Sequence, residues 1–317
     1  MFSLVKWLKG FISNLKKKKG LWFTLLTLLS IAGISLSLFL LTSMTQNVAK
    51  DVYVNMSKSY KTTLNNRIAN KEEMYLRTSI AVVSDNTLLN AMSQNDIVTV
   101  DTMLKSYNEN FIKSGFKDIK FAFYSASNQL NQYRSTVNAV LGTKNRLFGL
   151  EVLSDGVFIQ LLEPIYEKDK FLGVLEIREP ITSMKNYYKI NNQIFVFALD
   201  KKMIKRLSIK AKQNKYEDLF DDLKVQVASY DGKFVSSILK DGEEEFKKFK
   251  KVGYIVDDAY YKTYAKVSDI NGVDIGVFIV GERIEGSGAF VNVVDNMTKQ
   301  VTTVALGLVI SILLFMF

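Results

Sequence analysis

The sequence contains no cysteine and no histidine, and it has only two prolines, Pro164 and Pro180. The missing cysteines exclude disulfides, thiolate nucleophiles and cysteine-based zinc sites. The missing histidines exclude histidine metal ligands, histidine general bases and the phospho-acceptor of a histidine kinase within these 317 residues. The hydrophobic content of 48% is enough for a folded core, so intrinsic disorder is excluded as well.

Motifs for catalysis and phosphate binding are also missing from the sequence. There is no P-loop and no nucleophile elbow. The acidic pairs Asp221-Asp222 and Asp257-Asp258 are adjacent residues whose side chains diverge. The run Gly286-Ser287-Gly288 begins like a nucleotide fingerprint, but Val291 replaces the third glycine, so a hinge is the preferred interpretation. The sequence therefore predicts no enzyme, no cofactor and no metal site.

The net charge of +10 is concentrated at the N-terminus. Six lysines (Lys6, Lys9 and Lys16 to Lys19) precede the first apolar segment, which leaves 36 basic and 32 acidic residues elsewhere. Nucleic-acid binding would require a basic patch with interleaved aromatic residues on a folded domain. Lysines beside an apolar segment instead indicate a cytoplasmic N-terminus. We therefore predict a membrane protein with no nucleic-acid partner.

The first long apolar segment is Leu21–Met44, 24 residues without a charged side chain. As a helix it would measure about 36 Å, against a hydrocarbon core of about 30 Å. A cleaved signal peptide is the alternative, but its apolar region would span only about 7–15 residues before a small-residue cleavage site. We expect a cytoplasmic basic N-terminus at 1–20 and an uncleaved transmembrane helix at 21–44.

A second apolar run begins at Val301 and continues to Phe317. Its 17 residues are the lower limit for a membrane span, and a buried terminal helix is the alternative. We expect a truncated second transmembrane helix at 301–317, with the effector domain of a longer receptor beyond it. Residues 45–300 would then lie on the periplasmic or extracellular side of a bacterial inner membrane.

The outside region begins with a predicted stalk at 45–95. Apolar residues recur at near-helical spacing from Val48 to Val82, and no proline or glycine occurs between Gly33 and Gly115. A helix over 47–83 would be about 55 Å long. A second helix is expected at 96–113.

Two modules with antiparallel sheets are expected after the stalk, at 96–190 and at 191–285. Strands of the first module are expected at 118–126, 147–153, 156–166 and 171–178. Strands of the second are expected at 194–199, 225–230, 233–239, 259–267 and 273–280. Turns are expected at Asp231-Gly232 and Asn271-Gly272, and helices at 216–223 and 243–251. The predicted fold class is therefore α+β.

Four motifs of the first module occur in a familiar order: Tyr133-Arg134, Gly149-Leu150-Glu151-Val152, Pro164-Ile165-Tyr166 and Gly173-Val174-Leu175-Glu176. This set, within residues 120–179, resembles the double Cache family of extracytoplasmic sensors, in particular its third subfamily. The resemblance implies two tandem PAS-like (Cache) sheet modules on the stalk helix, with a ligand in the first, membrane-distal module. It also implies a chemoreceptor, diguanylate cyclase or histidine kinase output. The neutral loop SASNQLNQ replaces the acidic loop common in that family, which leaves the ligand class open.

Five residues of the first module are the candidates for ligand binding: Arg134, Tyr133, Tyr124, Gln160 and Glu151. The guanidinium of Arg134 suits a small organic acid or another anion. A structural ion pair with Glu151 or Glu176 is the alternative. The two tyrosines would add hydroxyl groups to the site or pack in the core. Gln160, polar on an apolar strand face, needs either a ligand or a backbone partner.

The sequence thus predicts the ligand-sensing region of a bacterial transmembrane receptor. We expect a small-molecule ligand and a homodimer paired through the stalk helices. Of the three possible outputs, we expect chemotaxis. The alternative function is a membrane-anchored module that binds a protein, or spaces membrane partners, without sensing a small molecule.

Overall fold

The structure is a computed structural model of the chain. It describes residues 19–116, 118–127, 133–213, 216–220, 222–284, 296–297, 299–304, 306–308 and 310–311. The chain divides into two compact units. One unit comprises residues 55–286, and the other combines residues 1–54 with residues 287–317.

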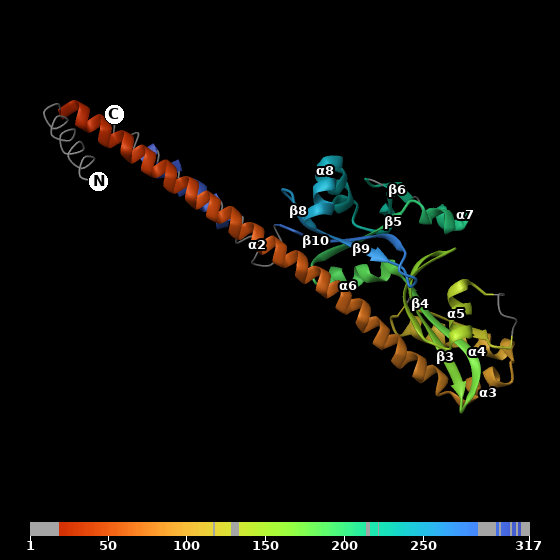
Figure 1. Cartoon of the computed structure of the whole chain (residues 1–317). Coiled ribbons are helices and arrows are strands. Elements are labelled where there is room, and N and C mark those ends of the chain that lie inside the picture. The colour runs from red at the N-terminus through yellow and green to blue at the C-terminus, as the bar shows by residue number, and fades with distance from the viewer. Residues whose placement is uncertain are drawn as a thin grey trace. The chain divides into compact units, whose positions relative to one another are not determined.

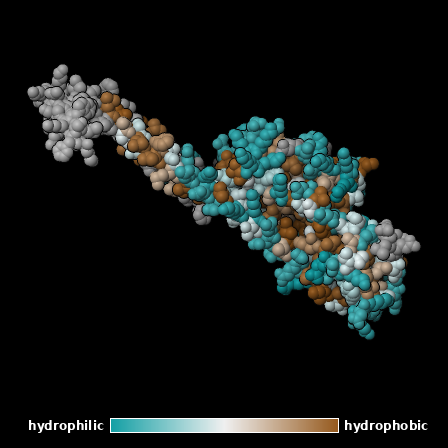
Figure 2. Space-filling view, viewed as in Figure 1, coloured by the Kyte–Doolittle hydropathy of each residue, from teal (hydrophilic) through white to brown (hydrophobic). Residues whose placement is uncertain are grey.

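Helix α2 (Lys19–Val83) contains the first predicted membrane segment and the helix predicted at 47–83 in one element of 65 residues. The rest of the predicted stalk, up to residue 95, lies beyond α2 and includes the separate helix α3 (Asn86–Ser93). Apolar side chains are exposed along its N-terminal part, among them Leu28, Leu36 and Phe39, and Figure 2 shows this stretch in brown. Within the described residues, one helical segment, Ile31–Val83, is long and apolar enough to cross a membrane. That criterion uses length and composition only.

The second predicted membrane helix, at 301–317, is only partly covered by the described residues. The described residues between 301 and 311 are helical, while residues 312–317 lie outside the described part of the chain. The predicted hinge at 286–288 and most of the basic segment at 1–20 also lie outside it. A pair of transmembrane helices flanking the outside region therefore stays a prediction.

The first predicted module (residues 96–190) contains a four-stranded sheet in the order β1-β4-β3-β2, with every neighbouring pair antiparallel. Figure 1 labels two strands of this sheet, β3 and β4. Its strands are β1 (Lys120–Ser125), β2 (Leu147–Leu153), β3 (Gly156–Glu167) and β4 (Lys170–Pro180). The helices here are α3 (Asn86–Ser93), which precedes the module, α4 (Ile97–Lys113), α5 (Ser135–Thr143), η1 (Ile181–Ser183) and α6 (Met184–Ile190). The predicted strands and the predicted helix at 96–113 are confirmed.

The second module (residues 191–285) contains a six-stranded antiparallel sheet in the order β6-β7-β5-β10-β9-β8. Its strands are β5 (Gln193–Asp200), β6 (Tyr216–Asp218), β7 (Leu223–Gln226), β8 (Tyr254–Val256), β9 (Tyr260–Ser268) and β10 (Asp274–Arg283). Its helices are η2 (Met203–Arg206), α7 (Ile209–Lys212), η3 (Val227–Ser229) and α8 (Gly232–Val252). The tandem-sheet α+β architecture follows the prediction.

Two predicted elements of the second module are wrong. The helix expected at 216–223 is instead strand β6, which pairs with β7. The hairpin expected around Asp231-Gly232 is instead the start of α8, because the Asp231 carboxylate accepts the N–H of Phe234 as a helix N-cap. The Asn271-Gly272 turn is confirmed, since β9 and β10 pair across it.

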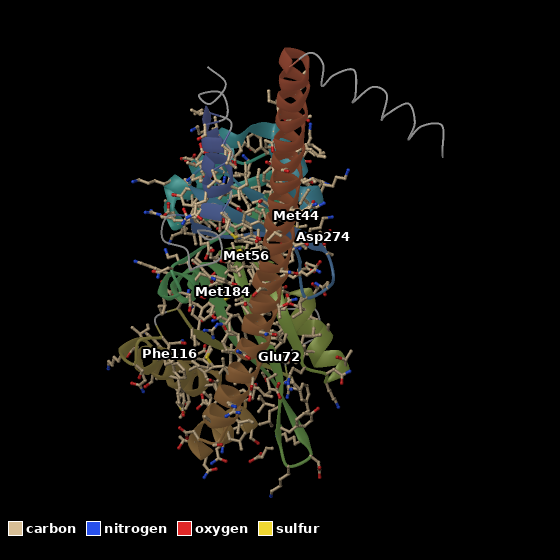
Figure 3. All side chains as sticks on the ribbon, turned by 90° about the vertical axis from the view of Figure 1, so that its left-hand side faces the viewer. Met44, Met56, Glu72, Phe116, Met184 and Asp274 are labelled. Carbon is tan, nitrogen blue, oxygen red and sulfur yellow. The ribbon has the colours of Figure 1, made fainter. Side chains whose placement is uncertain are left out.

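Helix α2 packs against both modules over its residues 55–83. Tyr60 lies 5.9 Å from Tyr261 of β9, measured between ring centroids, and Tyr75 lies 6.3 Å from Phe148 of β2. Lys71 forms an ion pair with Glu179 of β4. Figure 3 shows Met56 and Glu72 on the two corresponding stretches of α2. One helix thus contacts both sheets.

Candidate functional site

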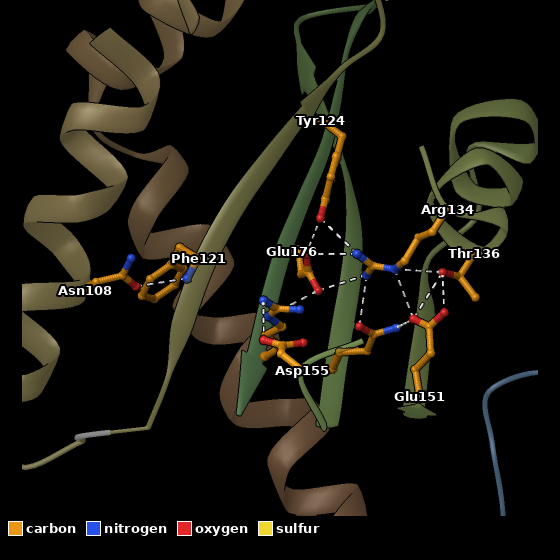
Figure 4. A network of polar contacts seen from close by, with 10 residues as sticks. Asn108, Phe121, Tyr124, Arg134, Thr136, Glu151, Asp155 and Glu176 are labelled. Carbon is orange, nitrogen blue, oxygen red and sulfur yellow. Dashed lines mark hydrogen bonds and ion pairs between the residues drawn. The ribbon is translucent and has the colours of Figure 1, made fainter. Parts of the chain in front are cut away.

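The candidate site is built where helix α5 begins. Arg134 occupies the N-cap position with extended backbone angles and makes no side-chain capping bond to α5. Serine, threonine, aspartate and asparagine are strongly preferred at this position because their side chains satisfy free N–H groups. Here the side chain extends away from the helix start and over the sheet (Figure 4). Local helix stability therefore does not explain the arginine.

All three guanidinium nitrogens of Arg134 donate hydrogen bonds. Nε donates to Glu151 Oε2 at 3.1 Å, and Nη2 donates to Glu176 Oε1 at 2.9 Å. Nη1 donates to the Tyr124 hydroxyl at 2.9 Å, and Nη2 also donates to Gln160 Oε1 at 3.0 Å. We call these residues, together with Thr136, the Arg134 centre (Tyr124, Arg134, Thr136, Glu151, Gln160 and Glu176).

The partners of Arg134 are also bonded to one another. The Tyr124 hydroxyl donates to Glu176 Oε2 at 2.6 Å, and the Thr136 hydroxyl donates to Glu151 Oε1 at 2.9 Å. The amide of Gln160 donates to Glu151. Each partner arises from a different element, namely β1, β2, β3, β4 or α5, so the centre joins the whole sheet to its covering helix.

Burial makes this cluster electrostatically strong. Gln160 is 0% exposed and Glu176 is 1% exposed, whereas the Arg134 side chain keeps 22% of its surface accessible. Burial opposes the charge on Arg134, but Glu176, Tyr124 and Glu151 together outweigh this effect and raise the pKa of the guanidinium. Burial and Glu176 together raise the pKa of Tyr124 to about 12. At neutral pH the arginine is therefore charged and the phenol is protonated.

A second arginine borders the centre. Arg178 Nε lies 3.8 Å from Glu176 Oε1, and its Nη2 donates to Asp155 at 3.4 Å. Its guanidinium lies 4.6 Å from the centroid of the Phe158 ring. Glu176 is therefore placed between two arginines.

The structure brings the five predicted site residues together. Four of them (Tyr124, Arg134, Glu151 and Gln160) belong to one hydrogen-bonded cluster, and the Tyr133 ring lies 5.0 Å from the Tyr124 ring, edge to face. From the sequence, Glu176 was predicted only as a structural ion-pair partner, and Thr136 was not predicted as a site residue. Thr136 was hidden because α5 was not predicted, so nothing placed its hydroxyl on the sheet side.

A cavity of about 670 Å³ lies apart from this centre and is lined by α2, β2, the end of α8 and β9. Among the described residues, no group of three or more acidic side chains is arranged to hold a metal ion. The polar side chains of the Arg134 centre bond to one another, so a ligand bound there would exchange with some of these contacts.

No family model and no curated protein matches the sequence. Similar solved structures include the extracellular domain of vpHK1S-Z8, assigned as a histidine kinase (12% identity, 74% of this chain and 95% of that chain, TM-score 0.40). The ligand-binding domain of Mlp24 with asparagine is 13% identical (83% and 99%, TM-score 0.33). The ligand-binding domain of the Pseudomonas fluorescens chemoreceptor CtaA with L-isoleucine is 10% identical (74% and 94%, TM-score 0.35). Each of these structures is an extracellular or ligand-binding domain of its own protein.

Proposed function

We propose that this chain is the extracytoplasmic sensing region of a transmembrane receptor and that its first module binds a small zwitterionic molecule. The observation that carries the proposal is the Arg134 centre. It places one guanidinium, two carboxylates and three neutral polar groups in the interior of a small module.

The cost of such a centre argues for a use beyond stability. Moving a charge out of water costs several kcal/mol even when it is paired, and apolar residues of similar volume are often at least as stabilising. The arginine also occupies a helix N-cap without capping the helix. Departures from local sequence rules are expected at functional sites.

The ligand class follows from the charges at the centre. Arg134 already faces the carboxylates of Glu151 and Glu176, so a purely anionic ligand would displace them without supplying a replacement cation. A molecule with a carboxylate and an ammonium group supplies both, because the carboxylate accepts from Arg134 and the ammonium donates to a freed glutamate. We therefore favour an amino-acid-like ligand over the simple organic acid expected from the sequence.

Signalling would use the contacts between the sheets and α2. A ligand shifts a conformational equilibrium only by its differential affinity for the two states. Exchange of ligand contacts at Glu176 would alter β4, whose residue Glu179 is paired with Lys71 of α2. Chemotaxis output, dimerisation through α2 and a periplasmic location stay predictions.

The second candidate is a binding or structural module without a small-molecule ligand. One observation favours it, since each guanidinium nitrogen of Arg134 already has a protein partner. In that case the centre would act as a polar staple between α5 and the sheet.

Thermal melting of the chain in detergent micelles separates these functions. We would measure the melting temperature with each proteinogenic L-amino acid and with simple mono- and dicarboxylic acids. Sensing predicts that at least one amino acid stabilises the chain by about 2.7 kcal/mol at a hundred times its Kd. The Glu176→Gln variant should lose this shift, and the matched Glu163→Gln variant, whose partner is the exposed Arg146, should keep it. A panel without any shift would favour the staple.

A further inference from the structure

The chain contains a polar cavity that is separate from the Arg134 centre. It has a volume of about 670 Å³, within the range of about 300–1,000 Å³ typical of small-molecule sites. Its walls come from α2, from β2 of the first module and from the second module. Its polar and charged lining residues are Lys61, Asn65, Lys250, Lys251, Tyr264, Lys266, Ser268 and Asp269. We call it the lysine cleft.

Three of its lysines form no ion pair with any described residue: Lys61, Lys251 and Lys266. They come from three separate elements, namely α2, the last turn of α8 and β9. Lys250 adds a fourth positive charge to the lining. Lysines from distant parts of the sequence therefore line one cavity.

The negative groups that face the cleft are already satisfied. Asp269 Oδ1 accepts the backbone N–H groups of Asn271 and Val273, each at 2.9 Å, and Oδ2 lies 4.0 Å from Arg206. The C-terminal end of α8 attracts positive charge, which accounts in part for Lys251. However, the carbonyl of Gly253 beyond that end accepts from Ser57 Oγ and from the backbone N–H of Tyr264. The cleft therefore retains an excess of positive charge.

We propose that the lysine cleft binds a small phosphate-class oxyanion, as free phosphate or as the phosphate group of a metabolite. Lysine ammonium groups bind phosphate as point charges, and Asn65 and Ser268 would add neutral donors. This site is independent of the zwitterion proposed for the Arg134 centre.

A bound oxyanion would tie three parts of the unit together. Lys61 belongs to α2, whereas Lys251 and Lys266 belong to the second module. The lining also includes Leu150 of β2, whose carbonyl accepts the backbone N–H of Ile270 at 2.7 Å. Binding at the cleft would therefore stabilise the packing of α2 on both sheets.

The test measures melting of the full chain in micelles with inorganic phosphate, with pyrophosphate and with a hexose monophosphate. Sodium chloride at equal ionic strength serves as the reference. The Lys61→Gln/Lys266→Gln variant removes two cleft charges. The Lys58→Gln/Lys105→Gln variant removes two charges from exposed positions that do not line the cleft.

At least one phosphate compound should raise the melting temperature of the wild type and of the control variant by several degrees. The cleft variant should lose this shift. Line broadening in ³¹P spectra of the same probe gives a readout that does not depend on folding. The absence of any shift and broadening in the wild type would overturn the proposal, and so would an equal loss in both variants. Comparing the melting-temperature shift with hexose monophosphate to the shift with inorganic phosphate shows whether the cleft prefers a phosphorylated metabolite or free phosphate.

Discussion

The two modules use the sheet face beneath their covering helix in opposite ways. Beneath α5, the first module combines the Arg134 centre with a buried apolar cluster of four residues: Val137, Val140, Leu162 and Val174. Beneath α8, the second module has a buried cluster of fourteen apolar residues that includes Phe234, Phe246, Phe249, Tyr260 and Tyr264. Similar architecture thus encloses a charged interior in one module and an aromatic interior in the other.

The second module also contains a buried charge, but its setting differs. Lys262 is 0% exposed and donates to Asp241 and Asp257, each at 2.5 Å. Both carboxylates retain access to water, with side chains 18% and 20% exposed. Glu176, by contrast, is 1% exposed. The buried carboxylates of the Arg134 centre are therefore shielded from water more completely than those around Lys262.

The largest effect is expected from Arg134→Met. This change leaves the buried Glu151 without a cation and the buried Glu176 with Arg178 alone, at 3.8 Å, which should reduce the free energy of unfolding by about 3–5 kcal/mol. Urea denaturation monitored by circular dichroism would measure it. The control is Arg146→Met, whose ion pair with Glu163 lies at the surface, where such pairs contribute about 0–1 kcal/mol. Equal losses would contradict the contrast between buried and surface pairs.

A smaller loss is expected from Lys262→Met in the second module. Water can solvate Asp241 and Asp257 once the ammonium group is removed, so we expect a loss of about 1–3 kcal/mol. Ligand-dependent shifts of the melting temperature should be unchanged. If this variant lost as much stability as Arg134→Met, or abolished ligand binding, the two charged clusters would not differ as described.

Removing a helix N-cap is expected to have a still smaller effect on stability. Asp231→Ala removes the N-cap of α8 and should cost about 0.5–2 kcal/mol, as measured by urea denaturation. Arg134→Ser would place a favourable cap at α5 and yet should destabilise the chain, because the charged centre is lost. A net gain in stability from Arg134→Ser would show that the arginine contributes little.

The smallest effect concerns pH at the contact between α2 and the second module. Burial raises the pKa of Glu282, and a hydrogen bond with Tyr60 offsets part of this rise. Because the folded pKa lies above the unfolded value of about 4.3, the stability contributed by the protonated acid is present at low pH. It is lost as the pH rises through the folded pKa. In paired denaturation curves, the free energy of unfolding of Glu282→Gln should therefore rise relative to that of the wild type as the pH increases from acidic to neutral. A difference between the two proteins that does not change with pH would contradict this.

Much of the fold could be predicted because its signals are local. The alternating residues of β1 and the apolar spacing of α2, which no proline interrupts, identify these elements directly. The prediction was wrong where one dipeptide is compatible with two kinds of structure. Asp231-Gly232 is typical of a hairpin turn, but an aspartate also caps a helix, and the spacing of Phe234, Val235 and Ile238 is helical. Gly242, with a φ of 85°, then interrupts α8 and conceals its length.

The site could be predicted as a set of residues but not as a network. Arg134 and its neighbours were identified because charged and polar side chains in apolar strands need partners. The pairing of Glu151 and Glu176 with one arginine depends on strand register, which brings Gln160 opposite Arg178 and Leu162 opposite Glu176. Such register arises from tertiary packing. The lysine cleft likewise joins residues more than 180 positions apart.

The central claim is that the amino-acid-like ligand binds in the first module, at the Arg134 centre. Hydrogen–deuterium exchange of the full chain in micelles, with and without a mixture of the proteinogenic L-amino acids, tests it most directly. We predict slower amide exchange in β1, β4 and α5 and unchanged exchange within the core strands β5, β9 and β10. Protection confined to the second module, or no protection in either module, would contradict this account.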